Sequence, residues 1–254
     1  MALQYKDLAK MLDHSLLHPT MTDTILREGC ELALKYDTAS VCIKPYAIPL
    51  ACSVLKGSNV LVGTVIGFPH GNSTTTIKIA EAQEAARAGA AEVDMVINIG
   101  KALGEDWGYV QDEIAQINQI TVGEGAILKV IFENDFLTNN HIAKLCEICG
   151  EIGVAFVKTS TGYGFIKQEN GMYSYKGATL EHLKLMREKS PTNVQVKAAG
   201  GVRTLKDLVT VNLLGVSRVG ATATAAMLNE ATERLKHNER LEDLVEVNLS
   251  GGGH

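Results

Sequence analysis

The chain has 254 residues, 46% of them hydrophobic, and carries a formal net charge of −5 at pH 7. This length suits one large α/β domain or two small ones, with enough apolar residues for a sizeable core. The acidic balance argues against a nucleic acid or an anionic membrane surface as the partner.

Cysteines and the N-terminal segment indicate the compartment. The five cysteines are scattered through apolar segments, a pattern typical of a reduced chain without a disulfide framework. The N-terminus has no apolar signal core, and no segment approaches the ~18 unbroken apolar residues of a membrane helix. We therefore expect a soluble, cytoplasmic protein with no membrane partner.

Short apolar runs alternate with amphipathic stretches along the chain. In chain order, the predicted strands are 11–17, 38–43, 59–68, 91–98, 126–133, 154–160, 194–200 and 216–220. The helices predicted after them are 22–35, 46–56, 73–88, 107–122, 138–151, 178–189, 204–214 and 222–236. Strands with so few polar residues on either face indicate a parallel sheet that is covered by helices.

Eight β-then-α units without a linker predict a single-domain α/β protein, a (β/α)8 TIM barrel. The competing architecture is an open doubly wound sheet, which usually carries a glycine-rich phosphate loop after its first strand. The segment MLDHSLLHP has no such loop. We expect the barrel domain to span residues 1–249 and residues 250–254 (SGGGH) to form a flexible tail.

Strand alternation predicts an unusually polar barrel interior. Successive side chains of a strand point to opposite faces, and in EVDMVIN the residues between the acids are aliphatic and suit the helix-facing side. The residues predicted to face inward include Asp13, Cys42, Glu92, Asp94, Asn98, Lys129, Lys158 and Lys197. Since barrel interiors are ordinarily filled by Val, Ile and Leu, these residues indicate a functional site.

Lys158 and Lys197 fall near the ends of the sixth and seventh predicted strands. Two close amines would depress each other's pKa and leave one neutral and nucleophilic near pH 7, as attack on a carbonyl to form a Schiff base requires. Asp94, two strands back, could move a proton on and off carbon. The competing interpretation is a buried ion pair without catalysis. The histidine and cysteine spacings complete no metal site.

Glycines after the last two predicted strands indicate an anion site. Gly200 and Gly201 directly follow Lys197 in the run KAAGGVRT, and residues 219–222 open the last helix. Paired glycines and helix N-termini both present backbone N–H groups to phosphate, and barrels often place phosphate on these loops. The competing interpretation is two tight turns.

The motifs EVDMVIN, FVKTSTG and KAAGGVRT, with DHSLL and VGTVIGFP, resemble those of the deoxyribose-phosphate aldolase family over nearly the whole chain. The resemblance implies a class I aldolase, a carbon–carbon lyase without metal or cofactor. Such an enzyme reversibly cleaves 2-deoxy-D-ribose 5-phosphate to D-glyceraldehyde 3-phosphate and acetaldehyde. It also implies a small-molecule substrate and a homo-oligomer.

On the family pattern, Lys158 forms the Schiff base, and Lys197 and Asp94 transfer protons between the imine and the enamine. The substrate- and phosphate-binding positions implied are Gly162, Gly200, Gly201, Gly220, Ala221 and Thr222. The positions expected beside the site are Asp13, Cys42, Lys129 and Thr159.

This chain departs from the family pattern at several positions. Tyr163 stands where some members have a lysine, an insert-like stretch spans residues 165–176, and Ala221 and Thr222 replace serines. Three other functions remain open at this point. They are another Schiff-base barrel aldolase (a transaldolase or fructose-bisphosphate aldolase), a phosphate-binding barrel isomerase, and a non-catalytic sugar-phosphate binder.

Overall fold

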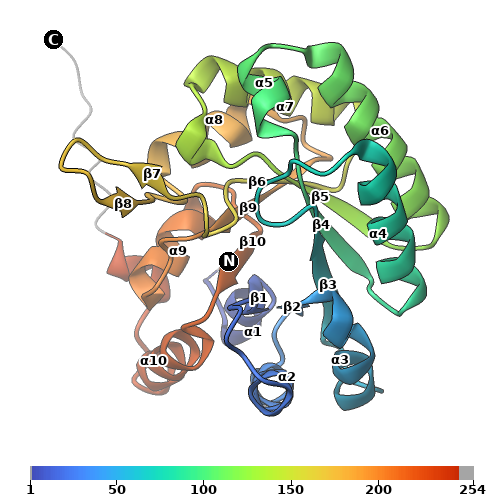
Figure 1. Ribbon diagram of the computed structural model, residues 1–254. Coiled ribbons are helices and arrows are strands. Elements are labelled where there is room, and N and C mark those ends of the chain that lie inside the picture. The colour runs from blue at the N-terminus through green and yellow to red at the C-terminus, as the bar shows by residue number, and fades with distance from the viewer. Residues whose placement is uncertain (1, 246–254) are drawn as a thin grey trace, which may run out of the picture.

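The aliphatic runs form the strands of a closed barrel in the computed structural model, which describes residues 2–245 (Figure 1). Its parallel strands neighbour one another in the closed order β1-β10-β9-β6-β5-β4-β3-β2. Their bounds are β1 Leu12–Leu16, β2 Ser40–Ile43, β3 Leu61–Ile66, β4 Glu92–Val96, β5 Ile127–Ile131, β6 Phe156–Lys158, β9 Gln195–Ala199 and β10 Arg218–Ala221. All eight predicted strands are present, which confirms the predicted barrel.

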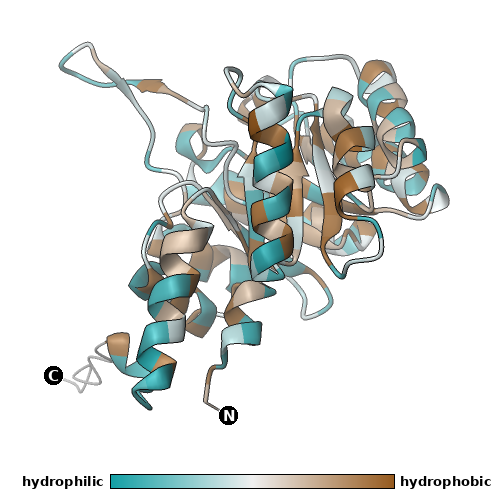
Figure 2. Ribbon diagram, turned by 90° about the horizontal axis from the view of Figure 1, so that it is seen from below, coloured by the Kyte–Doolittle hydropathy of each residue, from teal (hydrophilic) through white to brown (hydrophobic). Residues whose placement is uncertain are grey.

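The predicted helices surround the barrel in the expected order. They are α2 Asp23–Tyr36, α3 Ile48–Val54, α4 Thr75–Arg87, α6 Trp107–Gly123, α7 Asn139–Ile152, α8 Leu180–Lys189, α9 Leu205–Leu213 and α10 Thr224–Lys236. Five of them begin behind a threonine whose side chain accepts from a backbone N–H of the first turn, which satisfies a donor that the helix itself cannot. Figure 2 shows hydrophilic residues along their outward sides.

Several short elements were not predicted. Three of them lie in connections, namely α5 Ile99–Leu103, η1 Pro45–Ala47 and η2 Asn134–Phe136, while α1 Tyr5–Ala9 precedes the first strand and η3 Leu241–Leu244 follows the last helix. A small hairpin of β7 Ile166–Lys167 and β8 Tyr173–Ser174 occupies the insert after β6. These elements are too short for a 3.6- or 2-residue period to be detected in the sequence.

The apolar core lies between barrel and helices, while charged side chains fill the barrel. Val93 and Met95 of β4 point outward into the core and are fully buried. Their neighbours Glu92 and Asp94 are only 1% exposed, on the inward side with lysines of other strands. The predicted inward polar face is thus confirmed for these strands. Asn98 lies beyond β4, where its side chain caps α5.

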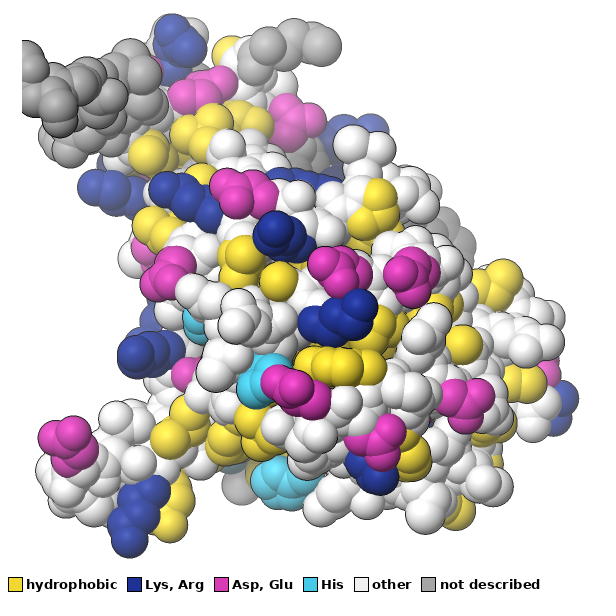
Figure 3. Space-filling view, turned by 90° about the horizontal axis from the view of Figure 1, so that it is seen from above, with side chains coloured by type: hydrophobic (Ala, Val, Ile, Leu, Met, Phe, Trp, Pro, Cys, Tyr) yellow, Lys and Arg dark blue, Asp and Glu magenta, His cyan; other side chains and the backbone are white. Residues whose placement is uncertain are grey.

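The surface adds little to the picture of function. In Figure 3, acidic and basic side chains are interspersed over the face seen from above. No helix within residues 2–245 is both long and apolar enough to cross a membrane. The predicted tail at 250–254 and the predicted domain boundary at 249 lie outside the described residues.

Candidate active site

Strand register brings the two singled-out lysines together. Lys158 ends β6 and Lys197 lies in the middle of β9, and the two are direct partners across the parallel pair. Both ammonium groups donate to the same oxygen, Asp94 Oδ2 of β4, over 2.7 Å each. The two nitrogens therefore lie no further apart than twice that distance. Sequence alternation had placed all three residues correctly at one site.

Lys197 has a second carboxylate that Lys158 lacks. Its Nζ lies 2.5 Å from Asp13 Oδ2, which β1 contributes from the other side of β10. Asp13 is fully buried and also accepts from Ser40 Oγ at 2.7 Å. Asp13 thus lies deeper than the two lysines and neutralises one of them.

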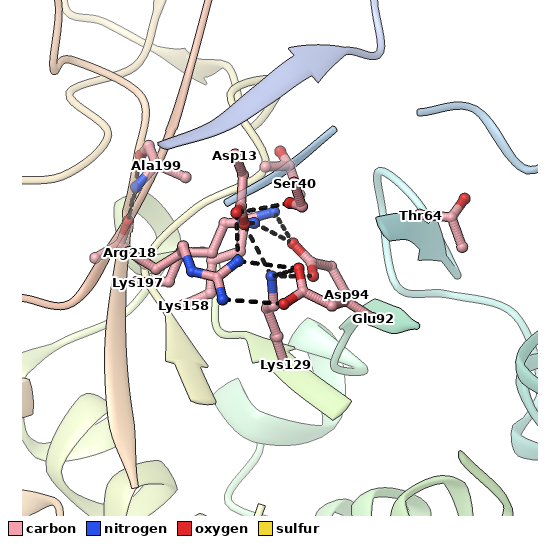
Figure 4. Close-up of polar contacts among 12 residues, drawn as sticks. Asp13, Ser40, Thr64, Glu92, Asp94, Lys129, Lys158, Lys197, Ala199 and Arg218 are labelled. Carbon is pink, nitrogen blue, oxygen red and sulfur yellow. Dashed lines mark hydrogen bonds and ion pairs between the residues drawn. The ribbon is translucent and has the colours of Figure 1, made fainter. Parts of the chain in front are cut away.

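Further charges continue this network inside the barrel (Figure 4). Lys129 of β5 lies 2.8 Å from Asp13 and 2.6 Å from Glu92. Arg218 of β10 bridges the same two acids, 2.6 Å from Asp13 Oδ1 and 3.0 Å from Glu92 Oε1. The expected neighbours Asp13 and Lys129 are therefore structural supports beneath the reactive lysines, since neither reaches the cavity described below. Arg218 was not singled out from the sequence.

The unequal surroundings shift the two lysine pKa values in opposite directions. Burial, together with the charge of Lys197, lowers the pKa of Lys158 against the opposing pull of Asp94. The pKa of Lys197 lies well above its usual range because Asp13 and Asp94 outweigh the cost of burying it. Mutual depression of both pKa values, as the sequence suggested, is therefore wrong for Lys197, because two acids hold its charge. Of the two lysines, Lys158 is therefore the one that loses its proton more readily.

A cavity of about 220 Å³ opens above the lysines at the carboxyl ends of the strands. Its wall includes nine residues predicted from the sequence, which are Cys42, Lys158, Gly162, Lys197, Gly200, Gly201, Gly220, Ala221 and Thr222. One end of this cavity is therefore formed by the amines and the other by the glycine turn after β9 and the start of α10. Burial raises the pKa of the Cys42 thiol to about 11, which leaves it a protonated, unreactive part of the wall.

Thr159, which was expected beside the site, contacts the neighbouring strand β9. Its hydroxyl donates to the carbonyl of Ala199 at 3.2 Å and accepts from the Ala199 N–H at 3.0 Å. It therefore ties β6 to β9 and holds Lys158 and Lys197 in register, and it is absent from the cavity wall among the described residues.

The cavity wall also contains residues that sequence reasoning missed. Arg203 and Tyr175 line it beside Gly200 and Gly201. Arg203 follows the paired glycines within KAAGGVRT, so its charge next to an anion-binding turn was a signal available in the sequence. Thr161 also lines the wall, where its N–H and hydroxyl both donate to the buried carboxylate of Glu133. That contact spans two strand–helix connections and has no sequence signature.

Comparison with known proteins gives one consistent result. A family model described as DeoC/LacD family aldolase matches residues 8–228. A deoxyribose-phosphate aldolase of Rhodopirellula baltica is 50% identical over 232 residues, 91% of this chain and 92% of that protein. One of Treponema denticola is 41% identical over 222 residues, 87% of this chain and 98% of that protein.

Solved structures agree in fold. A structure named QR15, an aldolase, superposes with a TM-score of 0.83 at 33% identity, covering 92% of this chain and 99% of that one. A tetrameric deoxyribose phosphate aldolase of Aeropyrum pernix superposes with a TM-score of 0.79 at 27% identity, covering 91% of this chain and 93% of that one.

Proposed function

The chain belongs to the DeoC/LacD family of aldolases, and from this premise we propose that it reversibly cleaves 2-deoxy-D-ribose 5-phosphate. The products are D-glyceraldehyde 3-phosphate and acetaldehyde, and the intermediate is a Schiff base on Lys158. The observation that carries the assignment to Lys158 is the asymmetry around Asp94. Of two amines on one carboxylate oxygen, only Lys197 has a second acid, so Lys158 loses its proton first.

The first half of the reaction forms the imine. The neutral Lys158 amine attacks the aldehyde carbon of the open-chain sugar, and the resulting hydroxyl leaves as water after it takes a proton. The ammonium of Lys197, held charged by Asp13 and Asp94, is the acid placed to supply that proton. The cationic nitrogen that results withdraws electrons from the carbons beyond it.

The second half breaks the carbon–carbon bond. The Asp94–Lys197 pair, which has given a proton to the departing water, accepts the proton of the hydroxyl on the third sugar carbon. The electrons left on that oxygen form the new carbonyl, and those of the breaking carbon–carbon bond move onto the imine nitrogen. Glyceraldehyde 3-phosphate leaves, and an enamine remains on Lys158. Asp94 and Lys197 then relay a proton to the enamine carbon, and water releases acetaldehyde from the iminium. Every step has its reverse, so the same groups serve synthesis.

The other end of the cavity suits the phosphate. The Gly200–Gly201 turn has left-handed backbone at both glycines, which exposes N–H groups that a side chain would shield. Thr222 precedes α10, whose N-terminus favours an anion. Arg203 adds a positive charge at the same wall. This chain lacks the lysine that some family members carry after Gly162, so Arg203 is the cation on this part of the wall.

Reductive trapping tests the proposal. Acetaldehyde and borohydride are expected to leave a two-carbon adduct on Lys158, located by peptide mass spectrometry, and EDTA is expected to leave the cleavage rate unchanged. Lys158→Leu should lose both the adduct and essentially all cleavage of deoxyribose 5-phosphate while its circular dichroism spectrum stays native. An adduct on Lys197, or substantial turnover by Lys158→Leu, would reverse the assignment.

We also propose that the protein works in the cytoplasm as a homo-oligomer and that the barrel domain extends to residue 249. The tetrameric relative from Aeropyrum pernix supports the oligomer, and light scattering combined with size-exclusion chromatography tests it directly.

A further inference from the structure

The insert after β6 forms an arm that stands beside the cavity. We define this arm as residues 163–178; it contains the antiparallel pair β7 and β8 and stands out from the body of the molecule at the lower left of Figure 3. Its tip is exposed, as Met172 and Tyr173 show with 67% and 63% of their surface open. A two-stranded hairpin is marginally stable by itself, so its base must be fixed by other contacts.

Asp135 fixes one side of that base. Its carboxylate, which follows β5 in η2, accepts from the backbone N–H groups of Lys176 (2.7 Å) and Gly177 (2.9 Å). These are the two residues directly after Tyr175. The orientation of Tyr175 is therefore set by a contact to the barrel rim rather than by the exposed tip.

The glycine turn after β9 fixes the other side. The N–H of Ala178 donates to the carbonyl of Gly200 at 2.9 Å. Gly177 lies so close to this turn that a Cβ there would stand 2.7 Å from the Gly200 oxygen. Since Gly200 and Gly201 form the anion-binding end of the cavity, the arm is docked on the very segment that we assign to phosphate.

This docking places Tyr175 in the cavity wall next to Gly200, Gly201 and Arg203, and Tyr163 at the start of the arm also lines the wall. One ring carbon lies 3.3 Å from where a Gly200 Cβ would be, and the ring of Phe165 meets it edge-on with centroids 5.4 Å apart. The ring is thus held between two neighbours. Within residues 2–245 its hydroxyl has no protein partner.

We propose that Tyr175 is a specificity-determining residue whose hydroxyl donates a hydrogen bond to the phosphate of the substrate. The inference rests on the function proposed above. A phenol hydroxyl is a neutral donor, and hydrogen bonds to an ionised acceptor are the strong ones. The bound ring also separates the phosphate from solvent at the cavity rim. The Tyr175 hydroxyl therefore supplies a contact to the phosphate from the returning side of the arm, whereas Tyr163, at the start of the arm, cannot contact the phosphate as a cation.

Tyr175→Phe removes the hydroxyl and keeps the ring in place. The measurement is the ratio of kcat/KM for 2-deoxyribose 5-phosphate to kcat/KM for 2-deoxyribose. We expect this ratio to fall about tenfold, since a hydrogen bond to a charged group is worth about that factor or more. The change should appear in KM for the phosphorylated substrate, and inhibition of deoxyribose cleavage by inorganic phosphate should weaken in parallel.

Tyr173→Phe is the matched control, because it removes the same hydroxyl from an exposed position on the same arm. It should leave the ratio unchanged. Asp135→Asn should lower the ratio in the same direction as Tyr175→Phe, because it weakens the contact that orients the arm. An unchanged ratio in Tyr175→Phe, or an equal loss with both substrates, overturns the inference.

Trapping with acetaldehyde separates this inference from the proposed function. Acetaldehyde carries no phosphate, so the Tyr175→Phe enzyme should still form the adduct on Lys158. If the wild-type enzyme forms no adduct, the proposed function fails and the inference fails with it. If the adduct forms in both enzymes while the ratio stays constant, only the role of Tyr175 fails.

Discussion

At the scale of single residues, Lys158 and Lys197 are both lysines, are paired across neighbouring strands and share a carboxylate partner, yet their pKa values shift in opposite directions. The difference comes from Asp13, which contacts only Lys197 of the two. A second acid stabilises the ammonium form of Lys197. Burial and the neighbouring cation destabilise the ammonium form of Lys158. On the proposed mechanism, Lys197 is therefore the cation that donates a proton, and Lys158 is the amine that attacks.

Lys197→Leu tests this division of roles through pH. Removing Lys197 takes away a like charge beside Lys158 and one of the cations that share Asp94, so the pKa of Lys158 should rise. Since the neutral amine reacts, the rate of acetaldehyde adduct formation should fall at least about tenfold at pH 7, one pKa unit being a tenfold change in the neutral fraction. The increase in this rate with pH should also occur at a higher pH than in the wild type. Stopped-time borohydride trapping across pH 6–10 measures both effects.

Lys189→Leu is the control, since this lysine is exposed on α8 and its loss changes the net charge equally. Its profile should superpose on that of the wild type. If Lys197→Leu also kept the wild-type profile, the two amines would not interact, and the pairing argument would be wrong.

The sequence predicted that three charged side chains lie together, but it could not predict how their pKa values differ. Alternation within the strands placed Asp94, Lys158 and Lys197 together, because a polar residue in an otherwise aliphatic strand has only one face to occupy. The charge of Lys197, however, depends on Asp13, which lies on the first strand. That contact follows from barrel closure, and no local pattern encodes it.

At the scale of elements, a buried ion pair holds the end of β4 between two helices. Lys78 of α4 donates to the carbonyl of Val96 at 2.8 Å and lies 2.9 Å from Glu113 of α6. Glu113 also accepts from the N–H of Asn98 at 3.0 Å. Both charged side chains are completely buried. The pair thus fixes the strand end just beyond Asp94.

Lys78→Met should destabilise the protein by about 3–5 kcal/mol, because it leaves the carboxylate of Glu113 buried without a counter-charge. Lys78→Met combined with Glu113→Gln should recover much of that loss, since the amide can still accept from Asn98. Urea denaturation of the wild type, both single variants and the double variant measures the coupling. If the losses in the free energy of unfolding were additive in the double variant, Lys78 and Glu113 would not stabilise each other.

The exposed pair Lys236–Glu233 on α10 provides the comparison, with side chains 63% and 64% open. Lys236→Met should change the free energy of unfolding little, because solvent screens such pairs. The contrast isolates burial as the cause of the larger effect.

The long elements were readable from the sequence, and the short ones were not. All helices of ten residues or more except α10 begin behind a side chain that caps the first turn, and the limits of these helices were predicted to within a few residues. The arm was visible only as extra chain after FVKTSTG. Its docking depends on Asp135 and Gly200, which are distant in sequence, so its position beside the cavity could not be predicted.

At the scale of the whole molecule, a charged barrel interior links stability to pH. Three cations around Asp13, namely Lys129, Lys197 and Arg218, hold the pKa of this buried carboxyl well below its usual range. Lys158, Lys197 and Lys129 do the same for Asp94. Burial alone lowers the pKa of His14 to about 4, and this ring bonds the hydroxyl of Thr224 at 2.9 Å.

The free energy of unfolding should therefore fall in two stages as the solution is acidified. All three groups have a folded pKa below the unfolded one, so their contribution is complete above the unfolded pKa and is lost as pH falls. For His14 the window runs from about pH 6.5 down to about 4 and amounts to about 3 kcal/mol. Asp13 and Asp94 add a further loss below about pH 4. Urea titrations at pH 7, 5.5, 4.5 and 3.5 resolve the stages.

His14→Asn separates the first stage, because the amide can keep a hydrogen bond to Thr224 without titrating. Its stability should stay level between pH 6.5 and 4.5 where that of the wild type declines. A parallel decline in both proteins would assign the loss to other groups.

The closing pair of the barrel has a consequence for how the protein is made. β1 pairs with β10, and the N–H of Val219 donates to the carbonyl of Met11. The first strand therefore cannot complete its pairing until the last strand has been synthesised. Such long-range pairing slows folding. While the ribosome is still synthesising the chain, β1 and β9 have open edges because β10 is missing, and Asp13 and Glu92 lack their contact with Arg218. A nascent chain stalled before β10 should therefore be a target for chaperones and proteases, whereas the released chain resists both.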